Sequence, residues 1–157
     1  MLFRSKDSLA TAVEYGDLRM VIRNQLSLGS LNVAQGRVGE AREHLHTALQ
    51  AAIQLNQRPL LLDCLAPFAE LFMAEGDRDD AALLVMLVTA DPAGRAMTKE
   101  RGAYLLAHIE AVLSADEMDA ARQRSRTSDL AAVVAQLLSE LETPLQSSSV
   151  KGKEVYK

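Results

Sequence analysis

Apolar and small residues recur along this chain at the spacing of a helix face. Between Ala41 and Ile53 they fall at i, i+4, i+7, i+8, i+11 and i+12, which places them on one side of an α-helix. Similar spacing continues as far as Leu141, and Ala and Leu dominate the apolar set, which favours closely packed helices. The pattern predicts an all-α fold.

Glycine and proline residues divide this pattern into about eight helices. Gly16, Gly36 and Gly76 are expected to end helices, and Pro59 suits a first helical turn. Pro67 lies inside one expected helix and predicts a kink or break there. The expected helices cover residues 3–15, 17–35, a stretch around 41–53, 59–75, 77–91, 98–113, 115–126 and 129–141.

The chain also matches itself after a shift of 40 residues. Identical pairs include Leu31 with Leu71 and Ala41 with Ala81. Such a period predicts a single antiparallel helix-hairpin solenoid, in which each unit buries its apolar face against the next. The expected parts are a domain over 1–141, with units over 1–16 (partial), 17–56 and 57–94 and a helical cap over 97–141, and a polar tail or cloning remnant over 142–157.

Over roughly residues 5–140 the chain resembles tetratricopeptide repeats (TPR). The residues that carry the resemblance are Leu28-Gly29, Gly36, Ala41, Leu45 and Ala48. The 40-residue unit is longer than usual and is similar to TPR-like modules of bacterial MalT/LuxR-type transcription regulators and signal-transduction ATPases. The resemblance implies a right-handed superhelix whose concave face binds a protein or peptide, as a regulatory module of a larger protein.

Composition and charge narrow the classes of function. The net charge is −4, which argues against a general nucleic-acid binder. The single cysteine, Cys64, excludes an internal disulfide and a multi-cysteine zinc site. No apolar run reaches the roughly 18 residues of a membrane span, so we expect a cytoplasmic protein without membrane contact.

No catalytic motif emerges, so we expect no enzyme, no cofactor and no metal. His44 and His46 diverge on a helix, and Glu40 with His44 gives too few metal ligands. Cys64 lies among leucines and is expected to be a buried, inert thiol. Three arginines near one helix end suit the helix dipole better than a phosphate site; they are Arg122, Arg124 and Arg126.

The remaining candidate is a groove on the concave face. Its expected residues follow two helical stripes 40 residues apart, with polar residues at the first and third positions. The eight residues are Arg23, Leu26, Ser30, Val33, Asp63, Ala66, Glu70 and Met73. The groove fits a peptide or a helix. Two alternatives stay open: Arg23 pairs with Asp63 across neighbouring helices, or the groove holds a small effector molecule.

The first expected helix has no preceding repeat in this sequence to cover it. Phe3, Leu9 and Val13 would then present an apolar face, which favours burial against a second copy. We therefore expect self-association through this end, most simply as a homodimer.

Overall fold

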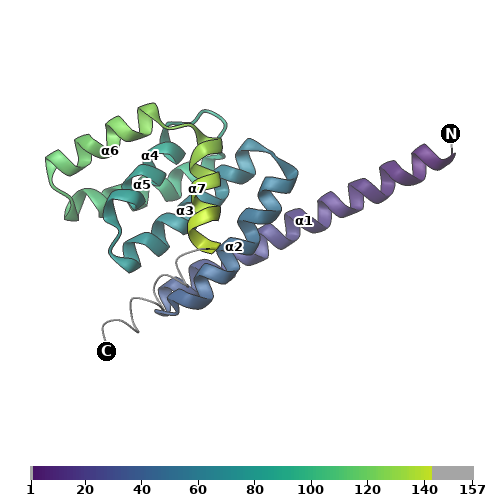
Figure 1. The fold of residues 1–157 in the computed structure, drawn as a ribbon, viewed down its shortest axis with the longest axis horizontal. Helices are drawn as coiled ribbons and strands as arrows, with labels where there is room; N and C mark the ends of the chain where they lie inside the picture. Colours follow the sequence, from purple (N-terminus) through teal and green to yellow (C-terminus); the bar gives the residue numbers. More distant parts are fainter. Residues whose placement is uncertain (1, 143–157) are drawn as a thin grey trace.

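The structure is a computed structural model, and it describes the backbone of residues 2–142 and the side chains of residues 16–140. Every regular element in these ranges is an α-helix, so the predicted all-α class is confirmed. Figure 1 shows the seven helices as a layered bundle from which the N-terminal half of α1 extends. They are α1 (Leu2–Ala34), α2 (Val38–Leu55), α3 (Arg58–Glu75), α4 (Arg78–Ala90), α5 (Ala96–Val112), α6 (Ala115–Thr127) and α7 (Leu130–Glu142).

The predicted end of a helix at Gly16 is wrong, because α1 runs through this residue without interruption. Gly36 and Gly76 are the glycines with positive φ among the described residues, so Gly16 does not take the left-handed conformation that ends a helix. A glycine inside a helix costs only about 1 kcal/mol relative to alanine, which the flanking helix tolerates. The predicted partial unit over 1–16 is therefore part of one long helix, and the described residues contain seven helices rather than about eight.

The two turns at Gly36 and Gly76 have the same geometry. Both glycines have positive φ, 77° and 89° respectively. After each glycine, the next N–H donates to the carbonyl five residues before it, over 2.8 Å in both turns. Ala41 and Ala81, one helical turn further on, have no exposed surface. The 40-residue shift therefore relates the α1–α2 hairpin to the α3–α4 hairpin in backbone geometry as well as in sequence.

Helix α3 begins with Pro59 in its first turn, as predicted, and continues through Pro67. A break at Pro67 is therefore excluded, and the kink, the other form of this prediction, stays a prediction. A proline in a helix interior removes one backbone hydrogen bond. Here the Pro67 ring is fully buried, and core residues such as Leu65 and Phe68 on either side hold the helix in place.

The last three helices do not continue the regular order. The predicted capping box opens α6: the Ser114 hydroxyl accepts from the Glu117 N–H, and the Glu117 carboxylate accepts from the Ser114 N–H, both over 3.1 Å. Helix α5 packs against α3 and α4, α6 against α4, and α7 against α2. Buried residues from all seven helices form one core cluster, which includes Ile22 of α1 and Leu137 of α7. Across residues 2–142, no helix combines the length and apolar character that a membrane span requires.

Candidate functional site

Helices α1, α3 and α5 border an open hollow of about 790 Å³, which we call the α1–α3–α5 hollow. The fold places α3 between α1 and α5, in contact with both. The floor of the hollow is apolar, because its buried lining residues are Ile22, Leu60, Ala66 and Pro67. Exposed and half-buried polar residues and the exposed Met97 surround this floor.

The structure brings together five of the eight residues that the sequence predicts for a groove. These five line the hollow: Arg23, Leu26, Ser30, Asp63 and Ala66. Glu70 forms an ion pair with Arg101, which lines the hollow. Val33 and Met73 do not line it. They lie near the C-terminal ends of α1 and α3, where they are half-buried and pack against the core cluster.

Helix α5 supplies lining residues that the sequence pattern did not identify. They are Arg95 just before the helix, and Met97, Thr98 and Arg101 within it. The 40-residue match decays before α5, so the spacing carries no signal for them. Arg19 was also missed, although it lies one helical turn before Arg23 and shares its face.

The two acidic side chains of α3 are held by residues from the α5 segment. Asp63 Oδ2 lies 3.3 Å from Arg95 Nε, and Asp63 Oδ1 accepts a hydrogen bond from Thr98 Oγ1 over 2.5 Å. Asp63 therefore pairs with Arg95 and not with Arg23, the partner in the alternative above. The ion pairs instead tie α3 to α5.

Glu70 and Arg101 form the second link between these helices. Arg101 donates to the Glu70 carboxylate and also to Ser30 Oγ of α1, over 2.7 Å. Burial raises the pKa of Glu70, and the neighbouring Arg101 guanidinium opposes that rise. Arg101 therefore joins three helices at one end of the hollow, and Glu70 largely balances its positive charge.

Two arginines of α1, Arg19 and Arg23, have no carboxylate partner among the side chains of residues 16–140. Arg19 Nη2 donates to the uncharged Gln57 Oε1 over 3.1 Å. Arg23 is exposed and makes no ion pair with another described residue. Since Asp63 and Glu70 are already paired, the side of the hollow formed by α1 is positively charged on a chain whose net charge is −4.

The structure also shows the surroundings of the other side chains that could be reactive, which are Cys64, His44 and His108. Burial, together with the nearby Asp63, raises the pKa of the Cys64 thiol to about 12, so this thiol stays protonated. His44 Nδ1 lies 2.5 Å from Gln25 Oε1, and the ring of His108 packs against that of Tyr104. Among the described side chains, no three His, Cys, Asp or Glu residues gather closely enough to hold a metal ion.

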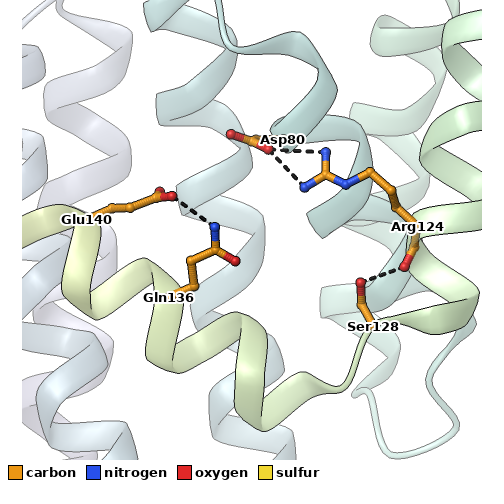
Figure 2. A network of polar contacts seen from close by, with 5 residues as sticks. All are labelled: Asp80, Arg124, Ser128, Gln136 and Glu140. Atoms are coloured by element: carbon orange, nitrogen blue, oxygen red, sulfur yellow. Dashed lines mark hydrogen bonds and ion pairs between the residues drawn. The ribbon is translucent and has the colours of Figure 1, made fainter.

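The arginines of α6 make structural contacts. Figure 2 shows Arg124 reaching from α6 to Asp80 of α4, with both terminal nitrogens 3.3 Å from Asp80 Oδ1. The Ser128 hydroxyl donates to the Arg124 carbonyl over 2.5 Å at the end of α6. Arg122 lies 3.1 Å from Asp119 on the same helix. Arg124 therefore joins α6 to α4, whereas Arg122 is paired within its own helix, and both contacts support the structural interpretation of this cluster.

The residues predicted for self-association lie outside the described side chains. Phe3, Leu9 and Val13 belong to the N-terminal part of α1, where only the backbone is described. Further along the same helix, Met20 and Leu31 are exposed apolar side chains.

A comparison of the chain with protein-family models, curated proteins and solved structures finds no match.

Proposed function

We propose that this chain is a non-catalytic, TPR-like helical module that binds a segment of a protein partner in the α1–α3–α5 hollow. The observation that carries the proposal is the combination of a buried apolar floor and an exposed cationic side in one hollow. Sites of this composition bind a ligand through apolar contact and fix its orientation through a few polar groups.

The TPR-like assignment is supported by the repeated hairpin. The turns at Gly36 and Gly76 share their backbone geometry at a spacing of 40 residues, and α3 contacts α1 on one side and α5 on the other. We further propose, from the sequence resemblance alone, that the module is a cytoplasmic, regulatory part of a larger bacterial signal-transduction or transcription-regulator protein.

Apolar contact supplies the affinity in this proposal. A large apolar side chain of the partner that packs against the half-buried Leu26 and the exposed Met97 is removed from water, which is worth about 25 cal/mol per Å² of apolar area. Met97 is 82% exposed at the edge of the hollow, and its flexible thioether adapts to ligands of different shape. A partner segment would thus be held between Leu26 and Met97.

The test is a selection from a phage-displayed library of random dodecapeptides on the folded protein, followed by fluorescence polarisation with the selected peptides. Ser27 is exposed and lines the hollow, so Ser27→Trp fills the site without disturbing the core. We expect this variant to weaken peptide binding by about tenfold or more. The matched control is Asn24→Trp, an exposed position of the same helix outside the hollow. Equal binding by both variants would contradict the proposal.

A small-molecule effector is the second candidate function, and one observation favours it. The volume of about 790 Å³ lies within the range of sites that hold small ligands. A screen of small metabolites by thermal shift separates the two functions. A compound that raises the melting temperature of the wild-type protein but not of Ser27→Trp, with no peptide selected, would favour the effector site.

A further inference from the structure

The charges around the α1–α3–α5 hollow are unevenly distributed. On the side of α5, Arg95 and Arg101 are paired with the carboxylates of Asp63 and Glu70. On the side of α1, Arg19 contacts only an uncharged amide and Arg23 has no ion pair among the described residues. The α1 side therefore attracts an anionic ligand, whereas the α5 side is close to neutral.

The spacing of Arg19 and Arg23 limits the shape of that anion. Arg19 and Arg23 lie four residues apart on α1, so they share one face, with Cβ atoms about 5–6 Å apart. Each guanidinium binds a carboxylate best through two parallel hydrogen bonds. Two separate carboxylates on one face of a ligand therefore match this pair better than a single carboxylate does.

The apolar floor lies directly beside these arginines. Ile22 and Ala66 belong to this floor but are only 2% and 1% exposed, so they offer a ligand almost no accessible surface. The apolar surface open to a ligand belongs to Leu26, which is half-buried and lies about one turn after Arg23, and to Met97, which is 82% exposed. A ligand that reaches both arginines therefore also covers this surface, which a purely polar anion would leave in water.

From these observations we infer that the partner segment presents two acidic side chains on one face, next to a large apolar side chain. The acidic side chains bind Arg19 and Arg23, and the apolar side chain packs against Leu26 and Met97. This inference rests on the proposed function, and it names the class of peptide that the hollow selects. Nucleic acid fits less well, because its phosphates would also meet the acidic remainder of a chain with net charge −4.

The experiment analyses the sequences of the selected dodecapeptides and their affinity for a double variant. We expect pairs of Asp or Glu beside Leu, Ile or Phe to be enriched. Arg19→Gln combined with Arg23→Gln should weaken an enriched peptide by about tenfold or more. Arg37→Gln combined with Arg126→Gln is the matched control, because it removes the same charge from exposed arginines outside the hollow.

A double-mutant cycle tests whether the acidic side chains of the peptide bind Arg19 and Arg23. Replacing each Glu of the peptide by Gln and each Asp by Asn should weaken its binding to the wild-type protein. The same replacement should add little to the loss of affinity already seen in the Arg19/Arg23 double variant. High ionic strength should weaken the wild-type complex as well.

The outcomes separate this inference from the proposed function. Peptides that bind in the hollow without acidic enrichment, or that both double variants bind equally well, would overturn the inference and leave the proposed function in place. Failure to select any peptide that Ser27→Trp loses would overturn the proposed function, and the inference with it. Acidic peptides that only the Arg19/Arg23 variant loses would support both.

Discussion

Gly29 of α1 faces Leu45 of α2 so closely that a Cβ atom at Gly29 would lie 2.5 Å from Leu45 Cδ2. Forty residues later, the equivalent positions are Ala69 and Val85. The second pair has one carbon more on α3 and one carbon fewer on α4, so the combined side-chain size is the same. All of these positions are buried. The two hairpins thus fill the same space with complementary pairs.

This relationship predicts that Gly29→Ala destabilises the protein. The added methyl group overlaps Leu45 in a closely packed core, which costs roughly 1–3 kcal/mol of unfolding free energy. Adding Leu45→Val should recover most of that loss, because the double variant reproduces the pair found in the second hairpin. Urea denaturation of the single and double variants measures both effects. A double variant that is no more stable than Gly29→Ala would contradict the equivalence of the hairpins.

Gly16→Ala, unlike Gly29→Ala, is expected to stabilise the helix that contains it. Beyond its chain neighbours and its own helix backbone, no heavy atom of the described residues lies within 4 Å of a Cβ placed at Gly16, and the residue is inside α1. Alanine favours a helix interior over glycine by about 1 kcal/mol, so the substitution should increase the helix content. Far-ultraviolet circular dichroism measures this change. A decrease would indicate that Gly16 ends a helix after all.

Ala81 leaves no space for a larger side chain. It has no exposed surface at the start of α4, in the position that Ala41 takes in α2. Ala81→Leu should therefore cost about 1–3 kcal/mol of stability. Ala103→Leu, at an exposed position of α5, is the control and should change the melting temperature little. Equal stability of the two variants would show that the helices do not pack closely at Ala81.

The contact between Arg58 and Asp91 predicts a dependence of stability on pH. The hydrogen bond from Arg58 holds the pKa of Asp91 below its ordinary value, and the Ala93 N–H also donates to this carboxylate over 2.9 Å. A lowered pKa contributes stability above pH about 4, and that contribution is lost as the pH falls through the folded-state pKa.

Asp91→Asn should therefore reduce the unfolding free energy near neutral pH, by at most about 1 kcal/mol because Arg58 is largely exposed. The difference from the wild-type protein should shrink as the pH falls below about 4. Thermal unfolding across the acidic range measures it. A difference that is constant with pH would mean that the charge of Asp91 is not the cause.

The features that could be predicted from the sequence have local causes. The turns at Gly36 and Gly76 follow from glycine's access to positive φ, and the start of α6 follows from the capping box at Ser114. Gly16 misled the prediction because a glycine is compatible with both a helix interior and a helix end. Which of the two it takes depends on the residues that flank it.

The candidate site could be predicted only in part, for a related reason. Arg23 and Asp63 belong to stripes that the 40-residue repeat marks, so the spacing identifies them. The arginines at 95 and 101 reach the hollow because α5 packs beside α3, and no repeat in the sequence marks that approach. The partners of Asp63 and Glu70 therefore became clear only from the folded arrangement.

The central claim is that a partner segment binds in the α1–α3–α5 hollow, and nuclear magnetic resonance tests it most directly. Backbone amide signals of isotope-labelled protein are recorded while a selected dodecapeptide is added. The account predicts the largest shifts for the three segments that line the hollow, residues 19–30, 60–67 and 95–101. Shifts that concentrate on α6 and α7 instead, with the hollow unchanged, would contradict it.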